Sequence, residues 1–372
     1  LRNALWSIGA FEEILAHLSD AEKLAKKLDN PIPTGWISVF RSASLWQIGR
    51  SIEARKAAET ALTINEEPKD ISLGIGGNFY LGCVFVTSGD CQSAEIYFQK
   101  AVDSVEGELS HERCGLPFVP AVVSRSWLVW ALAERGEFDQ AMRHGEVALK
   151  IAEEVGHPFN LAHIYYDLGY FYGVKGEFEH AVDALEKAYA LIREWNLTYL
   201  SPFIMGFLGH VYAHSGRVKE GTTLLQQAVS DYQSMGLGLF RSLIGVQLGE
   251  ALFLAGRAEE AMTATEGALA LARERDERGF EAHALRLLGE ITAHPGLSQA
   301  ETARGHFEAA QTIAETLGMR PLLAHCQFGL GRLCRLEGRQ REAREHVGAA
   351  VTSYHELGMH RWHKQANAME QY

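Results

Sequence analysis

The chain has 372 residues, of which 47% are hydrophobic and 22% charged, and its formal net charge is −12. This composition is ordinary for a folded chain, and the acidic balance argues against direct binding to nucleic acid or to a membrane surface, both of which need a basic patch. No uninterrupted apolar run approaches the roughly 18 residues of a spanning helix, and no secretory signal starts the chain. Five cysteines without metal-ligand spacing do not make a disulfide framework, so we expect a cytoplasmic protein in a reducing compartment.

A marker alanine recurs along the chain at a nearly constant spacing. It stands at Ala21, Ala61, Ala101, Ala148, Ala188, Ala228, Ala268, Ala310 and Ala350, so that the intervals are 40, 40, 47, 40, 40, 40, 42 and 40 residues. In most copies a small residue lies seven positions before the marker, as at Ala181, and a turn glycine lies five positions earlier still, as at Gly176. These spacings predict pairs of short helices that pack closely through small residues.

Prolines and capping residues divide the chain at matching places. Pro31, Pro158 and Pro321 stand where a first helix should begin, and no proline falls in a predicted helix interior. The second helices should end eight residues after the marker, at Asp29, Gly156, Asn196, Gly236, Asp276, Gly318 and Gly358. Glycine and asparagine suit a left-handed C-terminal cap there, and aspartate suits it less well.

Three segments depart from the regular pattern. The longer intervals place surface loops at residues 104–118 and 293–300, and insertions of this size are cheap to tolerate. The glycine-rich residues 74–78 have no lysine and no preceding strand, so we interpret them as the loosely capped start of a helix.

The unit within residues 165–188 resembles the tetratricopeptide (TPR) family. Gly169 is followed by an aromatic residue, Tyr172, after three positions and by Ala181 and Ala188 after twelve and nineteen. The ordinary TPR period is 34 residues, and a longer period near 40 is found in TPR-like sensor domains of large bacterial ATPase regulators such as the maltose-regulon activator. The resemblance implies an all-α, right-handed superhelical solenoid over residues 1–372, with about eight complete helical pairs, partial units at the ends, and repeats that touch mainly their neighbours.

A second resemblance concerns residues 318–362. The motif A-H-C-x-x-G-L-G-x-L at residues 324–333 and G-M-x-x-W at residues 358–362 are similar to the closing repeat of bacterial fusion proteins. Those proteins join a class III adenylate or guanylate cyclase-like domain, a P-loop ATPase module and a TPR tail. Here Cys334 replaces the usual aromatic residue, and residues 360–364 are more basic. The resemblance implies a fragment of a longer protein that serves as the sensor or interaction arm of a signalling ATPase. The alternative is a free-standing TPR scaffold for protein complexes.

In the TPR family, ligands bind to the concave face, which the first helix of each repeat lines. The positions three before and one after the Leu-Gly glycine, together with their helical neighbours, predict a groove formed by Trp36, Trp46, Phe79, Trp130, His163, Tyr166, Tyr170, Phe203, His210, Arg286, His325, Phe328, Arg332 and Arg335. The resemblance implies a protein or peptide partner, or a small-molecule effector. The competing interpretation is that several of the rings form a core shared between adjacent repeats.

The sequence contains no motif for catalysis. It has no phosphate-binding loop, because no lysine precedes Ser or Thr, and no nucleophile stands in a recognisable motif. His210 and His214 lie at i and i+4 on a predicted helix, as two metal ligands would, but no third ligand accompanies them in the sequence. We therefore predict no catalytic residue, no metal and no cofactor, and we rank an enzyme that uses this His-lined groove below a binding module.

Overall fold

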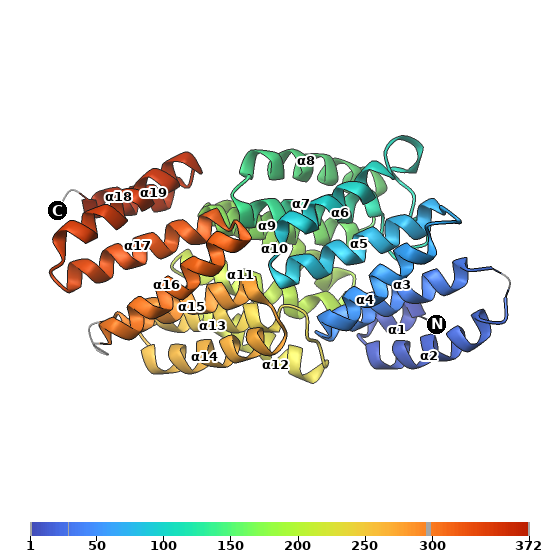
Figure 1. Cartoon of the computed structure of the whole chain (residues 1–372), viewed down its shortest axis with the longest axis horizontal. Helices are drawn as coiled ribbons and strands as arrows, with labels where there is room; N and C mark the ends of the chain where they lie inside the picture. The colour runs from blue at the N-terminus through green and yellow to red at the C-terminus, as the bar shows by residue number, and fades with distance from the viewer. Residues whose placement is uncertain (1, 29, 295–298, 371–372) are drawn as a thin grey trace.

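The computed structural model describes residues 2–28, 30–294 and 299–370, which form a solenoid of paired helices (Figure 1). The pairs among them are α3 (Ile32–Gln47) with α4 (Ser51–Ile64), α5 (Ile71–Ser88) with α6 (Cys91–Asp103), α7 (Pro120–Arg135) with α8 (Phe138–Val155), α9 (Pro158–Lys175) with α10 (Phe178–Glu194), α11 (Ser201–His214) with α12 (Val218–Ser234), α13 (Arg241–Leu254) with α14 (Ala258–Glu274), α15 (Arg278–Thr292) with α16 (Ala300–Leu317), and α17 (Arg320–Leu336) with α18 (Gln340–Glu356).

Partial units flank these eight pairs. They are α1 (Arg2–Ser7) and α2 (Phe11–Ala25) at one end and α19 (His360–Glu370) at the other, and the short 3₁₀ helices η1 (Gly107–Leu109) and η2 (Thr198–Leu200) lie in two of the joints. The two ends of the chain lie far apart along the long axis of the molecule (Figure 1). No strand occurs in the described residues, and the predicted all-α solenoid of paired helices is confirmed.

Left-handed residues end the helices where the sequence pattern places them. Gly176 follows α9 with φ 86°, and a Cβ at this position would lie 2.5 Å from the indole Nε1 of Trp362, so both the backbone and the available space favour glycine. At the joints between pairs, Asn196 and Asp276 adopt the same conformation, with φ 51° and 56°. Aspartate therefore takes the capping conformation despite its lower preference for it, whereas Asp29 lies outside the described residues.

The start of α5 differs from the prediction. The helix begins at Ile71, because the side chain of Asp70 accepts a hydrogen bond of 2.7 Å from the backbone N–H of Leu73. Residues 74–78 consequently lie inside the helix and do not form its loosely capped start. This helix is also the one span in the described residues that is long and apolar enough to cross a membrane by length and composition alone, and 72% of it is buried inside the solenoid.

Small residues allow the two helices of a pair to approach each other closely. A Cβ on Gly169 would lie 2.4 Å from the Cγ of Leu185 on the partner helix α10. Ala181 and Ala188, on the same face of α10, are completely buried. The period of small residues in the sequence thus corresponds to the seam between α9 and α10.

Enlarging this seam should destabilise the fold. We expect Ala181→Leu to lower the free energy of unfolding by roughly 1–3 kcal/mol, because a close-packed interface has no room for three additional carbon atoms. Urea unfolding measures the effect. Ala190→Leu is the matched control, since Ala190 is exposed on the same helix. Equal stability of the Ala181→Leu variant and the parent would show that the seam lies elsewhere.

The solenoid curls so tightly that repeats distant in the sequence touch one another. Helix α5 contacts α15, and α7 contacts α17. The backbone carbonyl of Gln47, at the end of α3, accepts hydrogen bonds from the N–H groups of Gly238 (2.8 Å) and Leu239 (3.0 Å) in the α12–α13 joint. The expectation that each repeat touches mainly its neighbours is therefore incomplete, because contacts across the inner axis add to the contacts between neighbours.

Candidate functional site

The structure divides the predicted groove residues between a closed and an open part of the inner wall. The closed part is a crevice of about 20 Å³, which is too small for a ligand and is lined by Trp46, Phe79, His163, Tyr166 and Phe203. The open part is a cavity of about 1080 Å³, whose lining includes Tyr170, His210, Arg286, His325, Phe328 and Arg332. The remaining three predicted groove residues line neither part. Trp130 is buried, Trp36 stacks on Phe40, and Arg335 lines an adjoining cavity of about 370 Å³.

A buried stack of aromatic rings connects the two parts, because Trp130 contacts Trp127 in the lining of the crevice and Tyr170 in the lining of the cavity. The Trp130 ring, with 0% of its surface exposed, lies 3.4 Å from the Tyr170 ring and 4.8 Å from the Phe240 ring, measured between centroids. Phe240 comes from the α12–α13 joint, which is inserted into the inner wall, and it is held there at a φ of 59°, a value that non-glycine residues rarely adopt. A partner cannot reach a fully buried ring. The structure therefore assigns Trp46, Phe79, Trp130, His163, Tyr166 and Phe203 to a core shared between repeats.

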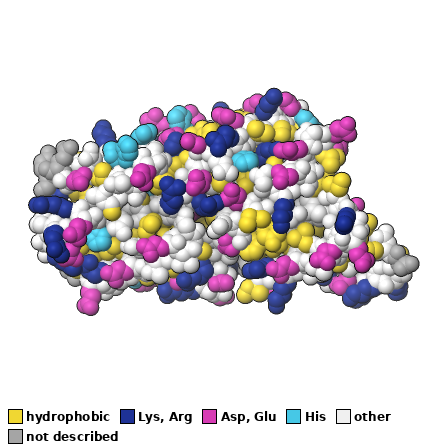
Figure 2. Space-filling model, turned by 45° about the horizontal axis from the view of Figure 1, so that its top comes forward, with side chains coloured by type: hydrophobic (Ala, Val, Ile, Leu, Met, Phe, Trp, Pro, Cys, Tyr) yellow, Lys and Arg dark blue, Asp and Glu magenta, His cyan; other side chains and the backbone are white. Residues whose placement is uncertain are grey.

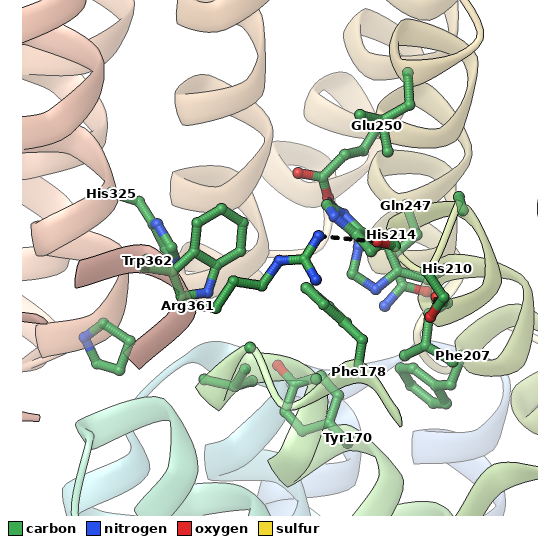
Figure 3. A pocket seen from close by; sticks show the side chains of 18 of the residues that line it. Tyr170, Phe178, Phe207, His210, His214, Gln247, Glu250, His325, Arg361 and Trp362 are labelled. Carbon is green, nitrogen blue, oxygen red and sulfur yellow. Dashed lines mark hydrogen bonds and ion pairs between the residues drawn. The ribbon is translucent and has the colours of Figure 1, made fainter. Parts of the chain in front are cut away.

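The open cavity lies between the first helices α9, α11, α13, α15 and α17 of five consecutive pairs and the terminal helix α19. Figure 3 shows Tyr170, Phe178 and Phe207 on one side, His210, His214 and Glu250 on another, and His325 and Trp362 opposite them. On the face of the molecule seen in Figure 2, basic and acidic side chains are intermingled, with hydrophobic side chains in patches between them. The residues that line the cavity include apolar rings and charged groups of both signs.

A carboxylate, Glu250 on α13, is the centre of the charged wall. Its Oε2 atom lies 2.8 Å from Nε2 of His210 and 3.5 Å from Nε2 of His214, and both imidazoles come from α11. Its Oε1 atom accepts a hydrogen bond of 3.0 Å from Nη2 of Arg286 on α15. The Nη1 atom of Arg286 in turn donates to Glu290 at 2.6 Å. Five first-helix side chains from three consecutive repeats therefore form one connected network.

The surroundings set the charges in this wall. Burial raises the pKa of Glu250, but the nearby Arg286 guanidinium and the two imidazoles outweigh it, so that the pKa lies well below its ordinary range. Burial lowers the pKa of His210, and it lowers the pKa of His325 to about 3. At neutral pH, Glu250 is therefore a carboxylate while His210 and His325 are neutral imidazoles.

A second carboxylate contributes to the cavity from α7. The hydroxyl of Tyr170 donates a hydrogen bond to Oε1 of Glu134, and Nε2 of His283 lies 3.3 Å from its Oε2. Glu134 and His283 are 149 residues apart in the sequence, so this contact exists only because the solenoid curls back on itself.

Helix α19 closes one end of the cavity. Arg361 donates a hydrogen bond of 3.2 Å from Nη2 to the backbone carbonyl of His214, and its guanidinium lies 4.8 Å above the Phe178 ring (Figure 3). The Trp362 ring packs edge-on against the His325 ring, with centroids 4.8 Å apart. The C-terminal helix therefore reaches across to repeats about 150 residues earlier in the chain.

Sequence reasoning missed Glu250, although the repeat pattern contains a signal for it. His210, Glu250 and Glu290 each directly follow the glycine of a Leu-Gly pair and are spaced by 40 residues. The prediction of no metal relied on the absence of a third ligand beside His210 and His214, and Glu250 supplies a third donor group: the ligand atoms of the three residues lie within 4.8 Å of one another. Arg361, Trp362, His283 and Glu134 had no such signal, because only the curvature of the solenoid brings them to the cavity.

Comparisons with known proteins identify the type of repeat. Residues 162–194 and 122–144 match models of the tetratricopeptide repeat, and these segments cover α9–α10 and part of α7–α8. No curated protein matches the chain in sequence.

Solved structures resemble the chain over most of its length. A Rap protein complexed with competence and sporulation factor has 11% identity and a TM-score of 0.57, over 91% of this chain and 96% of that one. NprR in complex with its cognate peptide NprX has 13% identity and a TM-score of 0.54, over 80% and 89%. Aspartyl phosphate phosphatase F from Bacillus subtilis has 13% identity and a TM-score of 0.52, over 93% and 92%. At such identities the likeness shows the fold, a TPR-like solenoid.

Proposed function

We propose that this chain is a non-catalytic interaction module that captures a peptide, or a segment of a partner protein, in the open cavity. The observation that carries the proposal is the cavity itself, with about 1080 Å³ on the inner wall of the solenoid. This volume is at the upper limit of the roughly 300–1,000 Å³ of small-molecule pockets, and it has room for several residues of an extended chain.

The lining suits a peptide because it offers two kinds of contact. The half-buried rings of Phe253 and Trp362 give apolar contact area, and Arg332 and Arg361 provide positive charge. Arg332 is exposed and forms no hydrogen bond or ion pair within the part of the chain that the structure describes. Aromatic and arginine side chains dominate the energy of many interfaces. The solved structure of NprR with its cognate peptide supports a ligand of this kind for a solenoid of similar fold.

We also propose a wider setting, the sensor arm of a bacterial, cytoplasmic signalling ATPase or cyclase-like regulator. Its support is the resemblance of residues 318–362 to the closing repeat of such proteins. Contacts between α5 and α15 and between α7 and α17 hold the curvature of the solenoid, so a ligand that prefers another curvature would shift the balance between two states.

A free-standing scaffold would have the same cavity. The coding sequence upstream of Leu1 separates the two: a P-loop motif supports the sensor arm, and a start codon contradicts it.

Reversing a charge in the cavity should weaken peptide capture. We expect Arg332 to pair with an acidic side chain or the C-terminal carboxylate of the peptide. Arg332→Glu should therefore lower the affinity for a bound peptide at least tenfold, equivalent to about 1.4 kcal/mol, because it replaces that cation with a like charge. The measurement is a screen of a synthetic heptapeptide library against the whole chain, followed by fluorescence anisotropy on the tightest peptide.

The control for this experiment is Arg341→Glu on α18, where the Arg341 side chain is 88% exposed on the outer surface. It changes the net charge equally and should leave the affinity unchanged. Equal weakening by both variants would assign the effect to net charge, and a screen without any bound peptide would contradict the proposed function.

A further inference from the structure

Three donor atoms converge on one point in the wall of the cavity. Nε2 of His210 and Nε2 of His214 both face Oε2 of Glu250, and the ligand atoms that the three residues offer lie within 4.8 Å of one another. Metal–ligand bonds of about 2.0–2.2 Å in a tetrahedral zinc site place neighbouring donors about 3.3–3.6 Å apart. The distance between Glu250 and His214 is already 3.5 Å, and that between Glu250 and His210, at 2.8 Å, requires the side chains to separate by about half an ångström.

Rigid elements hold the three side chains. His210 and His214 lie one turn apart on α11, and Glu250 occupies the position equivalent to His210 on α13, the first helix of the next repeat, which packs against α11. Their side chains are 20%, 11% and 15% exposed, so they are largely shielded from bulk water but reachable from the cavity. Such a site needs little ordering when an ion binds.

The residues around Glu250 orient it for this purpose. Arg286 holds Oε1 at 3.0 Å, which leaves Oε2 directed at the two imidazoles, and metal-binding carboxylates are commonly oriented by such a second hydrogen bond. Arg286 is itself paired with Glu290 at 2.6 Å. Two carboxylates and one guanidinium give this group a net negative charge, which favours a bound cation.

We propose that His210, His214 and Glu250 bind one Zn²⁺ ion, with a fourth coordination position open to the cavity. Two imidazole nitrogens and one carboxylate oxygen suit zinc, whereas Mg²⁺ and Ca²⁺ prefer ligand sets made entirely of oxygen. A site with three protein ligands and one open position can accept a water molecule or a donor group from a bound molecule.

The cavity also contains its own control. His283 contacts Glu134 at 3.3 Å in the same cavity, but only one imidazole faces that carboxylate. If the contacts of Glu250 with His210 and His214 were only ordinary hydrogen bonds, this cluster and the His283–Glu134 pair would respond to added metal in the same way. If the cluster around Glu250 is a zinc site, substitutions in it should weaken zinc binding, and a substitution in the His283–Glu134 pair should not.

The experiment is titration of the chelator-treated chain, residues 1–372, with ZnCl₂ by isothermal titration calorimetry. We expect one ion per chain at micromolar affinity or tighter, and no heat from MgCl₂ at the same concentrations. His214→Gln and Glu250→Gln should each weaken zinc binding by about 100-fold or more, since they remove a direct ligand, while His283→Gln should bind as the parent does. Circular dichroism identifies any variant that fails to fold.

A second readout on the unmodified chain does not depend on any variant. Cobalt(II) in a four-coordinate site with nitrogen and oxygen ligands should give the intense visible absorption of tetrahedral cobalt. Three results would each overturn the proposal. They are the weak absorption of six-coordinate cobalt, the absence of stoichiometric zinc binding, and a loss of zinc affinity in His283→Gln equal to that in the ligand variants. Because no peptide is present in either measurement, this outcome is independent of the peptide screen.

Discussion

Replacing Trp130 with alanine should lower the free energy of unfolding by about 3–5 kcal/mol, the usual cost of removing a large aromatic side chain from a core. The Trp130 ring is completely buried between Tyr170 and Phe240, and it also contacts Phe207 edge-on at 5.4 Å. These rings come from α7, α9, α11 and the α12–α13 joint. The variant therefore leaves a cavity where three consecutive repeats and the α12–α13 joint meet, and the surrounding helices can only partly fill it.

Trp195→Ala is the matched control, because the same side chain is 56% exposed after α10. Urea unfolding followed by circular dichroism should show a large loss for Trp130→Ala and a small one for Trp195→Ala. Nearly equal losses would mean that the Trp130 ring is accessible, as the groove interpretation requires. Tyr170→Ala should also be strongly destabilised, since its ring completes the stack and its hydroxyl is bonded to Glu134.

The repeats could be predicted because their signal is local. Ala181 and Ala188 mark the buried face of α10, Gly176 marks the turn before it, and each requirement recurs within one pair of helices. The curvature could not be predicted in the same way. The hydrogen bonds of Gln47 to the α12–α13 joint depend on small rotations between repeats that accumulate over nearly 200 residues, and no residue pattern within one repeat specifies their sum.

The candidate site also combines a feature that the repeat pattern predicts with one that depends on the curvature. The register of the Leu-Gly pairs placed His210, Arg286 and Arg332 on the inner wall, and these three residues line the open cavity. The same register placed Trp46 and Tyr166 on the inner wall, but the tight curl and the inserted joint with Phe240 close that part of it. Sequence position therefore predicts which side chains face the axis, and only the curvature decides whether the axis is open or filled.

A buried carboxylate, Glu277, should make the stability of the fold depend on pH. Its side chain, at the start of α15, is 2% exposed and accepts a hydrogen bond from the hydroxyl of Ser242. Burial raises the pKa of Glu277 from 4.5 to about 7, although Ser242 and Arg275 partly oppose this. The folded state therefore binds the proton more tightly than the unfolded state does. The resulting stabilisation is complete below pH 4.5 and is lost as the pH rises through 7.

Glu277→Gln should consequently stabilise the chain at alkaline pH, because glutamine remains neutral and can still accept the hydrogen bond from Ser242. At 1.36 kcal/mol per pKa unit, the difference between 4.5 and about 7 corresponds to about 3 kcal/mol. Urea unfolding should show this gain over the parent at about pH 8 and almost none at about pH 4, with Glu274→Gln as the control at an exposed position of α14. A loss of stability at pH 8 would contradict the argument, because it would mean that the charged carboxylate contributes more to folding through Ser242 and Arg275 than its burial costs.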